Sequence, residues 1–502
     1  MLTEIETEVV VAGAGPTGLM LAYELALAGV GTLVLEQLPQ RIEQVKGGGI
    51  QPRTAELLES RGLLEPLLER AAPRDGVGGH FAALPVPLDC TPWRTRHPTP
   101  IAIGQWEIEE VLEERATAVG ARVLRGAAVS GVSADDEGVV VTADGTRVRA
   151  QYLVACDGGH STVRALLGLP FPGRPGTHQA VLADLRLSAV SSLVPQQLGH
   201  MSTLMRQAGG YWAMTVPLGG DRYRVTFGRV DDQVEIDRGS PVTPEEITAA
   251  LQTLYGPETV LGSVDNASRF SDATRQLEQY RAGRVLFAGD AAHIHPPLGG
   301  QGLNLGIQDA FNLGWKLAAT VQERAPDGLL DSYHLERHPV GAQVLHHTSA
   351  QRVLADPRPS EDVVALRDIF VDLLRLPDAN RHIAGLMSGL SLGYPLPGAH
   401  PLTGQRIPDA DLVTENGPVR LSALFGSGHA VLLDLAGAVP AGLGLPPRVD
   451  LVRAVTDDDL GAAALLIRPD GYVCWASDSS DVLAGDLLAA VGDHLQRSAP
   501  GA

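Results

Sequence analysis

The amino-acid sequence predicts an α/β protein, and three features of the 502-residue chain carry that prediction. A glycine signature, Gly13-x-Gly15-x-x-Gly18, lies between a short apolar run and an amphipathic segment. A second glycine-rich segment occupies residues 289–302. Between the two, residues 178–270 contain a series of short strand-like segments. This order predicts a Rossmann-like domain assembled from two distant parts of the chain, with an antiparallel sheet inserted between them.

The first signature has the context of a dinucleotide-binding turn. The apolar run Glu8–Ala12 suits a buried parallel strand, and a helix is expected from Pro16 to about residue 29. Gly13 and Gly15 would allow a tight turn and a close approach of the backbone to a pyrophosphate, while Gly18 would let the helix pack on the strand. The free N–H groups at the start of that helix would then bind phosphate.

A carboxylate follows at the position expected for ribose recognition. The second apolar strand, Gly31–Leu35, ends at Glu36, which can accept hydrogen bonds from ribose hydroxyls. The same carboxylate would repel a 2′-phosphate. The tightly held nucleotide is therefore predicted to be FAD or NAD rather than NADP.

The second glycine-rich segment favours FAD. Arg284–Gly289 is predicted to be a buried strand, so that Asp290 falls at its carboxyl end, where ligands bind in open α/β sheets. A long helix is expected over residues 303–321, with its N-terminus pointing into the site. Such a helix N-terminus would stabilise negative charge on a reduced flavin. The alternative is an ordinary Asp cap on a glycine-rich loop.

Further segments resemble conserved motifs of the single-component (group A) flavoprotein monooxygenases, the aromatic hydroxylases. Gly289-Asp290 matches the family's GD motif, whose Asp holds the ribityl chain of FAD. Cys156-Asp157-Gly158-Gly159-His160-Ser161-x-x-Arg164 matches its DG motif, associated with FAD and with the nicotinamide nucleotide. Gln51-Pro52-Arg53-Thr54-x-Glu56-Leu57-Leu58 resembles a segment near the FAD, and Gly104-Gln105-x-x-x-Glu109 resembles one whose Gln touches it.

The resemblance extends over essentially the whole chain, and the most similar members tailor anthracycline, angucycline and tetracycline skeletons. One position departs from the family pattern. Lys46 stands before Gly47–Gly49 where many members have Arg, and Lys offers a point charge instead of a planar fork. On that side the flavin or its phosphate would therefore meet a point charge instead of a guanidinium.

Together, the two signatures and the resemblance predict a set of cofactor-binding residues. These are Gly13, Gly15, Pro16, Thr17, Gly18, Glu36, Gln37, Lys46, Arg53, Gln105, Asp157, Gly158, Gly289, Asp290, Pro297, Gly300, Gly302, Leu303 and Asn304.

The resemblance implies an FAD-dependent monooxygenase acting on a polycyclic aromatic polyketide in antibiotic biosynthesis. NADPH or NADH would bind transiently and reduce the flavin, and O2 would give a flavin C(4a)-hydroperoxide that hydroxylates the substrate. A disulfide reductase is disfavoured, because the chain has one dinucleotide fingerprint and no C-x-x-C or C-x4-C pair. Baeyer–Villiger oxidation, epoxidation and a flavin-binding module with little turnover remain alternatives. Since the flavin carries the chemistry, no catalytic side chain is assigned.

Several residues near the motifs have both a functional and a structural interpretation. His293 and His295 could exchange protons, yet loop histidines satisfied by the backbone are favoured, and no metal site is predicted because a third ligand is lacking. Asp157 could cap a helix starting near Ser161 instead of binding the cofactor. The same two interpretations, site residue or structural residue, apply to Arg275, Tyr280, Arg281, Trp93, Trp106 and Trp212.

Changes of pattern along the chain predict the domain organisation. Residues 1–175 and 271–395 form a discontinuous FAD-binding domain, and residues 176–270 form the inserted substrate-binding sheet. Its expected strands are Ala180–Leu187, Ser202–Arg206, Tyr211–Val216 and Tyr223–Arg229.

Residues 396–502 are expected to form a C-terminal domain, which the resemblance implies is thioredoxin-like. Cys474 has no C-x-x-C partner, so a structural role is expected for it. The expected strands and final helix of this domain are His429–Leu435, Val449–Val455, Ala463–Ile467, Tyr472–Ala476 and Leu483–Gln496.

The net charge and the cysteine content of the chain limit the classes of partner that it is expected to bind. A net charge of −20 and a pI near 5.1 argue against binding to nucleic acid or anionic membranes. Three cysteines without metal spacing fit a reducing cytoplasm, and no membrane span is expected. The expected partners are a polycyclic aromatic substrate and O2, for a monomer or a homodimer.

Overall fold

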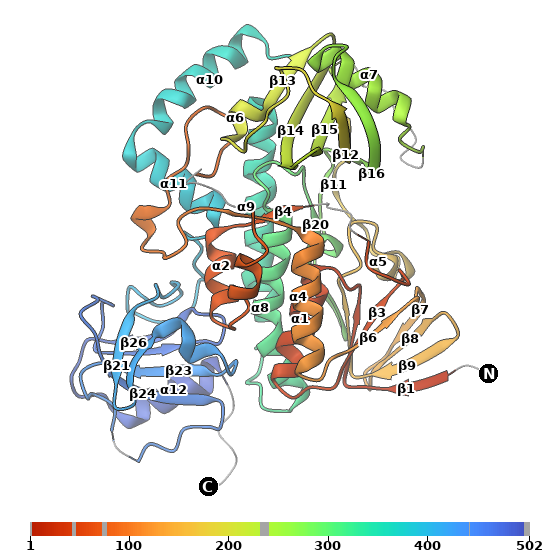
Figure 1. Cartoon of the computed structure of the whole chain (residues 1–502). Coiled ribbons are helices and arrows are strands. Elements are labelled where there is room, and N and C mark those ends of the chain that lie inside the picture. The colour runs from red at the N-terminus through yellow and green to blue at the C-terminus, as the bar shows by residue number, and fades with distance from the viewer. Residues whose placement is uncertain (1–2, 43–46, 73–77, 231–239, 441, 496–502) are drawn as a thin grey trace.

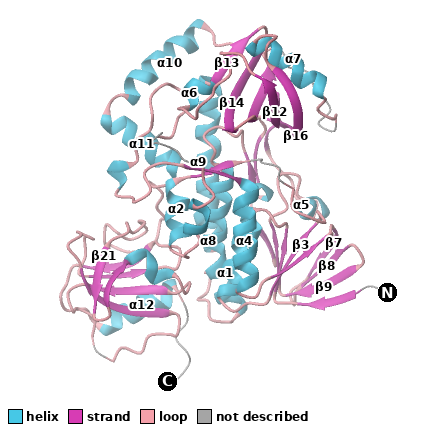
Figure 2. Ribbon diagram, viewed as in Figure 1, coloured by secondary structure: helices cyan, strands magenta, loops and turns pink. Residues whose placement is uncertain are grey.

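The computed structural model describes residues 3–42, 47–72, 78–230, 240–440 and 442–495. A central α/β region carries a second sheet above it and a C-terminal sheet beside it (Figure 1). Helices and strands are distributed over all three parts (Figure 2). The mixed architecture agrees with the α/β class predicted from the sequence.

The central sheet joins two segments that are far apart in the chain. Its strands run in the order β18-β19-β10-β2-β3-β6, and the five from β19 to β6 are parallel. Strand β19 pairs with β10, so the second glycine-rich segment enters the same sheet as the first. The bounds are β2 Val9–Ala12, β3 Thr32–Glu36, β6 Arg122–Arg125, β10 Tyr152–Ala155, β18 Arg281–Ala282 and β19 Val285–Phe287.

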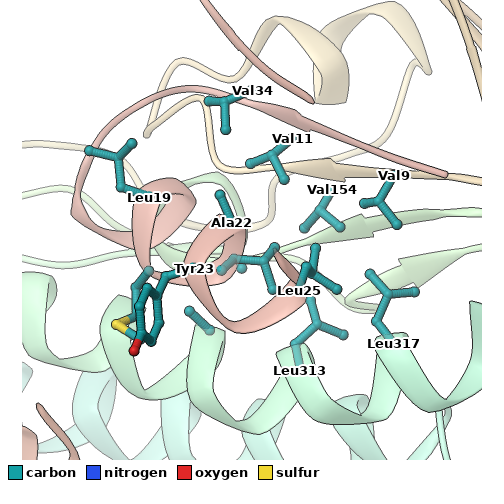
Figure 3. Packing of buried hydrophobic residues seen from close by; sticks show 14 of the residues in the cluster. Val9, Val11, Leu19, Ala22, Tyr23, Leu25, Val34, Val154, Leu313 and Leu317 are labelled. Carbon is teal, nitrogen blue, oxygen red and sulfur yellow. The ribbon is translucent and has the colours of Figure 1, made fainter. Parts of the chain in front are cut away.

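Three helices pack together on one face of this sheet. They are α1 Pro16–Leu27, α4 Gln105–Ala118 and α8 Gly302–Val321. Apolar side chains of α1 and α8 interdigitate with Val9, Val11 and Val154 of the strands (Figure 3). The helices α1 and α8 approach closely because glycines stand where they cross. A Cβ on Gly306 would lie 2.2 Å from Thr17 Oγ1, and one on Gly314 would lie 2.5 Å from Glu24 Cβ.

A four-stranded sheet flanks the central one near the N-terminus, in the order β1-β9-β8-β7. Its strands are β1 Thr3–Glu6, β7 Val129–Ala134, β8 Val139–Ala143 and β9 Thr146–Ala150. Short elements connect this region to the site: β4 Gly48–Ile50, α2 Pro52–Glu59, α3 Glu65–Leu68, β5 Ile101–Gly104 and α5 Thr162–Leu166.

The inserted sheet is antiparallel throughout, in the order β13-β14-β15-β12-β16. Its strands are β12 Gln179–Ala189, β13 Met205–Ala208, β14 Tyr211–Gly219, β15 Arg222–Arg229 and β16 Val260–Ser271. Helix α7 Pro244–Tyr255 covers one face, where Leu251 and Tyr255 pack on Val225 and Phe227. The strands predicted over Ala180–Leu187, Tyr211–Val216 and Tyr223–Arg229 are confirmed.

The strand predicted over Ser202–Arg206 is wrong in its first half. Residues Met201–Leu204 form one helical turn, α6, and the strand begins only at Met205. His200 caps that turn, because its ring Nδ1 accepts a hydrogen bond from the Ser202 N–H at 3.4 Å. Histidine is not one of the residues expected to cap a helix, so the sequence gave no indication that a helical turn begins here.

Three helices follow the second glycine-rich segment: α9 Ser332–Leu354, α10 Glu361–Leu374 and α11 Pro377–Ser388. Helix α9 packs on α8, α10 lies at the height of the inserted sheet, and α11 leads back toward the centre of the molecule (Figure 1). No helix within the described ranges is long and apolar enough to span a membrane.

The C-terminal sheet is mixed, in the order β22-β21-β24-β23-β25-β26. Strands β23 and β24 are parallel, and β25 and β26 run antiparallel to their neighbours. The four strands and the final helix predicted here are confirmed within a few residues. The bounds are β21 Asp411–Thr414, β22 Gly417–Arg420, β23 Ala430–Asp434, β24 Val449–Val455, β25 Ala464–Ile467, β26 Val473–Ser477 and α12 Ala484–His494.

Buried ion pairs attach this sheet to the central region. Both guanidinium nitrogens Nη1 and Nη2 of Arg468 bond the Glu336 carboxylate of α9 at 2.8 Å, and Lys316 Nζ of α8 donates to the same carboxylate at 2.8 Å. On the opposite side, Arg61 pairs with Glu24 of α1 and donates to the Pro469 carbonyl oxygen. These side chains are almost fully buried.

Candidate functional site

The first glycine signature forms a turn in which each glycine meets a different requirement. Gly13 has φ +102°, and a Cβ on it would lie 2.4 Å from the Cys156 carbonyl oxygen. A Cβ on Gly18 would lie 2.0 Å from the Gly13 carbonyl oxygen. Nothing lies within 4 Å of a Cβ on Gly15. Gly13 and Gly18 thus serve close packing, whereas Gly15 borders open space at the N-terminus of α1, where a phosphate can approach.

Glu36 lies at the carboxyl end of β3 and supports this turn. Its Oε2 accepts from the Ala14 N–H at 2.8 Å, and its Oε1 accepts from the Leu38 N–H at 2.9 Å. A carboxylate oxygen can accept more than one hydrogen bond, so both oxygens retain capacity for ribose hydroxyls. Gln37, the next residue, is exposed.

In the DG motif, Asp157 takes the expected capping role, and its role toward the cofactor stays a prediction. Oδ2 accepts from the Val163 N–H at 3.0 Å and thereby caps α5. Oδ1 is buried and has no hydrogen-bond partner among the described residues. The capping interpretation therefore explains half of this side chain, and the other oxygen is left to receive a donor from a ligand. Gly158 follows with φ +82°.

Arg164 joins the DG motif to the GD loop, 127 residues further along the chain. Its Nη2 donates to the Gly159 carbonyl oxygen at 2.7 Å, and its Nη1 donates to the Ala291 carbonyl oxygen at 3.0 Å. The guanidinium also stacks on Phe171, 3.8 Å from the ring centroid. The two motifs therefore belong to one site.

A buried carboxylate on α8 fixes the GD loop. Asp309 Oδ2 accepts from the Gly289 N–H at 3.1 Å and bonds His293 Nε2 at 2.7 Å. Asp309 Oδ1 accepts from Arg337 Nε of α9 at 2.7 Å. Arg337 lowers the pKa of Asp309 against the opposing effect of burial, so the carboxylate is ionised. Asp290 itself is exposed at the end of β19, free to meet a ligand.

The two loop histidines behave differently from each other. His295 follows the structural interpretation, because its Nδ1 bonds the Pro296 carbonyl oxygen at 2.8 Å. His293 is held by a carboxylate, Asp309, and not by the backbone. Burial lowers the pKa of His295, and its Nε2 is buried without a hydrogen-bond partner among the described residues. A Cβ on Gly302 would lie 3.7 Å from that nitrogen, at the start of α8.

Asn304 ties the start of α8 to the segment before α2. Its Nδ2 donates to the carbonyl oxygens of Gly49 and Gly300, and its Oδ1 accepts from the Gln51 N–H at 2.8 Å. Gly300 has φ +63°, and Pro297 before it is exposed.

Gly47 brings two further residues of the candidate set together. A Cβ on it would lie 3.4 Å from Gln105 Oε1 and 3.8 Å from Leu303. Gln105, Leu303 and Asn304, from two helices distant in sequence, thus converge around one glycine segment.

Lys46 and Arg53 are the two residues of the candidate set that are not seen at the glycine loops. Lys46 lies outside the described residues. Arg53 is buried and turns away from the glycine loops, since its Nη2 donates to the Asp470 carbonyl oxygen at 2.9 Å and its Nη1 pairs with Glu56. Its guanidinium packs over the Tyr472 ring. A role for Arg53 toward FAD stays a prediction.

The remaining aromatic and basic candidates are scattered. Strand alternation places Trp212 on the face of the inserted sheet opposite α7, where it packs over Gly228. Trp93 packs against α11, with its Nε1 donating to the Arg381 carbonyl oxygen at 2.8 Å. Tyr280 is fully buried beside His293. The other three have local roles: Arg275 bonds the Phe171 carbonyl oxygen, Arg281 pairs with Asp331, and Trp106 is half-buried beside Gly104.

The free face of the inserted sheet completes the site. Side chains alternate along β12, β14 and β15, so those not packed on α7 project from the other face. Cross-strand register aligns them in rows: Met214 with Thr226 and Leu182, and Val216 with Arg224 and Asp184. Leu182, Met214 and Val216 of these rows suit the face of a flat aromatic molecule, and Thr226, Arg224 and Asp184 add polar groups beside them.

The described residues fit FAD. The open turn at Gly15, the carboxylate of Glu36, the exposed Asp290 and the N-terminus of α8 are the parts that its pyrophosphate, ribose, ribityl chain and ring system require. Buried polar atoms without partners cluster there as well, on Asp157, His295 and Gln301. Asp309 and Arg337 were not anticipated, although polar residues such as Asp309 among the expected apolar positions of α8 are a signal that could have drawn attention.

Comparison with known proteins agrees with this geometry. The family model described as "FAD binding domain" matches residues 6–348, and the model described as "Aromatic-ring hydroxylase, C-terminal" matches residues 400–497. A Streptomyces rimosus protein named 12-dehydrotetracycline 5-monooxygenase/anhydrotetracycline 6-monooxygenase is 47% identical over 486 residues, covering 94% of this chain and 95% of that protein.

Solved structures show the same fold. OxyS anhydrotetracycline hydroxylase from Streptomyces rimosus superposes with a TM-score of 0.88 at 45% identity, covering 98% of this chain and 99% of that one. CabE, an aromatic hydroxylase from angucycline biosynthesis, superposes with a TM-score of 0.86 at 38% identity, covering 98% of this chain and 99% of that one.

Proposed function

The chain belongs to the family of FAD-dependent aromatic-ring hydroxylases, and from that membership we propose that it hydroxylates a polycyclic aromatic polyketide in antibiotic biosynthesis. The protein is a flavoprotein monooxygenase that uses NAD(P)H as its source of electrons. Relatives named for anhydrotetracycline and angucycline chemistry support the substrate class. Comparing NADPH with NADH in the activity assay determines which of the two nucleotides the enzyme prefers.

The observation that carries the proposal is the convergence of both glycine segments below the free face of the inserted sheet. Arg164 joins the DG motif to the GD loop, and Asn304 joins that loop to Gly49 and Gln51. The sheet meets these loops where Arg224 lies against Gly48, and a substrate held between them would be shielded from water, as ring oxygenation requires.

Each group of residues then has a defined task. The N-terminus of α1, open at Gly15, binds the pyrophosphate, and Glu36 accepts hydrogen bonds from the ribose. Asp290 binds the ribityl chain, and the N-terminus of α8 stabilises negative charge on the ring system. When bound, FAD supplies the redox and oxygen-activating chemistry. The sheet face orients the substrate, which positions one ring carbon for reaction.

Turnover with defined ligands tests the proposal. The purified protein should be yellow, and its NAD(P)H consumption should rise on adding an anhydrotetracycline-type, angucycline-type or anthracycline-type ring system. Mass spectrometry should find a product with one added oxygen atom, and NMR should place it on a ring carbon. If no polycyclic compound stimulates NAD(P)H consumption or gains oxygen, the substrate class is wrong. Oxygen inserted into a carbon–carbon bond would instead indicate Baeyer–Villiger chemistry.

We further propose that the enzyme works in a reducing cytoplasm as a monomer or a homodimer. The support for this location is that Cys90, Cys156 and Cys474 are all free thiols. Size-exclusion chromatography with light scattering determines the oligomer.

A further inference from the structure

The free face of the inserted sheet carries one guanidinium in a position to recognise a substrate oxygen. Arg224 lies on β15, and Asp184 stands directly opposite it on β12. Arg224 Nε donates to Asp184 Oδ1 at 2.8 Å, and Nη2 donates to Asp184 Oδ2 at 3.0 Å. The bidentate pair holds the guanidinium plane, so its orientation is determined before any ligand arrives.

The remaining nitrogen of Arg224 points at the junction with the flavin site. A Cβ on Gly48 would lie only 3.2 Å from Nη1. The preceding Gly47 lies against Leu303 at the start of α8 and against Gln105. Asp184 engages Nε and Nη2, and within the described ranges Nη1 is left without an acceptor. A fixed donor therefore lies where the inserted sheet meets the flavin loops.

A second polar group without a partner lies two residues along the same strand. Thr226 is 7% exposed, and its hydroxyl has no hydrogen-bond partner among the described residues. A buried hydroxyl without a partner costs free energy, which a ligand recovers by bonding it. Met214 and Leu182 flank Thr226 on the neighbouring strands, so this polar group sits in an apolar surface.

We propose that Arg224, oriented by Asp184, binds a carbonyl, enolate or phenolate oxygen on the edge of the substrate that lies along β15, with Thr226 bonding a second oxygen of that edge. This inference rests on the proposed function and narrows it. The substrates are polycyclic aromatics with an oxygen-bearing edge, and the apolar side chains Met214, Val216 and Trp212 contact the ring faces. Arg224 is thus a specificity-determining residue.

Anaerobic titration of the FAD-loaded enzyme tests this, with substrate affinity followed by the change in flavin absorbance. The probes are anhydrotetracycline and an analogue whose edge oxygens are methylated. Arg224→Met should weaken binding of the parent compound by roughly 10–100-fold and that of the methylated analogue much less, since a hydrogen bond to a charged group is lost. Arg222→Met is the matched control, because Arg222 lies on the same strand, is partly exposed and pairs loosely with Asp265 at 3.6 Å. It should bind like the wild type.

Thr226→Val provides a second, independent test of the inference in case Arg224→Met does not fold. The change removes a hydroxyl that has no partner in the protein, so the free enzyme should fold with unchanged or higher stability while binding weakens by roughly 3–10-fold. Wild-type affinity in both variants overturns the inference. The inference is also overturned if Arg224→Met changes the FAD content or the flavin spectrum and leaves the substrate affinity unchanged. That result would assign Arg224 to the flavin. If the wild type binds no polycyclic compound at all, it is the proposed function that fails.

Discussion

At the scale of single residues, the glycines of the first signature divide into two that serve close packing and one, Gly15, that borders open space. A side chain on Gly13 would collide with the Cys156 carbonyl oxygen, whereas a side chain on Gly15 would enter open space. Sequence spacing separates Gly18, which is expected to allow helix packing, from the other two glycines, but it does not separate Gly13 from Gly15. The separation depends on β10, which is more than a hundred residues away in the chain.

This difference leads to the first prediction. Gly15→Trp should fold with near wild-type stability and yet purify without colour, because the indole fills the pyrophosphate position. Gly13→Ala should instead lower the stability of the protein itself, since Gly13 has φ +102° and the Cβ meets backbone. Thermal unfolding and the flavin-to-protein absorbance ratio check both variants. Stoichiometric FAD in Gly15→Trp would contradict the position assigned to the pyrophosphate.

His347 of α9 gives a pH prediction. Burial lowers its pKa to about 4 from an ordinary value near 6.5. The unfolded chain therefore binds a proton more readily than the folded chain between these values, so stability is complete above pH 6.5 and falls as the pH drops toward 4. From pH 7 to pH 5 this group should cost on the order of 2 kcal/mol.

Urea unfolding at the two pH values measures this contribution. His347→Gln should lose less stability than the wild type over that interval. His382→Gln, at an exposed position on α11, should retain the wild-type dependence. Identical pH dependence in the wild type and His347→Gln would show that His347 does not carry the effect.

At the scale of elements, local patterns predicted most strands and both long helices that meet at the site. The run Glu8–Ala12 gave β2, and the expected helix over 303–321 gave α8, because hydrophobic periodicity reports burial directly. Ion pairs between residues of different helices or strands leave no periodic pattern in the sequence. Asp309 and Arg337 lie on different helices, and Asp184 and Arg224 lie on strands whose register depends on the whole sheet. Arg53 shows the converse, since a motif residue is used for contact with the C-terminal sheet.

The ion pairs between α9 and the C-terminal sheet give an element-scale prediction. Arg468→Met removes both hydrogen bonds to Glu336 and leaves that carboxylate buried with Lys316 as its remaining cation. The free energy of unfolding should fall by roughly 3–5 kcal/mol. Arg375→Met, which breaks an exposed pair with Asp372, should cost less than about 1 kcal/mol. Equal losses in the two variants would show that burial does not set the strength of the Arg468 contact.

At the scale of the whole molecule, we expect the C-terminal sheet to act as a structural partner without thiol chemistry. Burial raises the pKa of Cys474 to about 12, and its Sγ–H donates to the Leu466 carbonyl oxygen at 3.4 Å. Cys474→Ser preserves that donor, so coupled NAD(P)H oxidation and product formation should match the wild type. A large loss of turnover in a folded Cys474→Ser enzyme would revive a thiol mechanism.

Glu336 and Arg337 are consecutive residues of α9, and they face opposite partners. Glu336 holds Arg468 of the C-terminal sheet, while Arg337 holds Asp309 and, through it, the Gly289 and His293 ends of the GD loop. Exchange of C-terminal segments between relatives must therefore preserve the ion pair between residues 336 and 468. A chimaera that takes its last hundred or so residues from another family member should keep its flavin loop in place only if the donor supplies a cation at position 468 that matches Glu336.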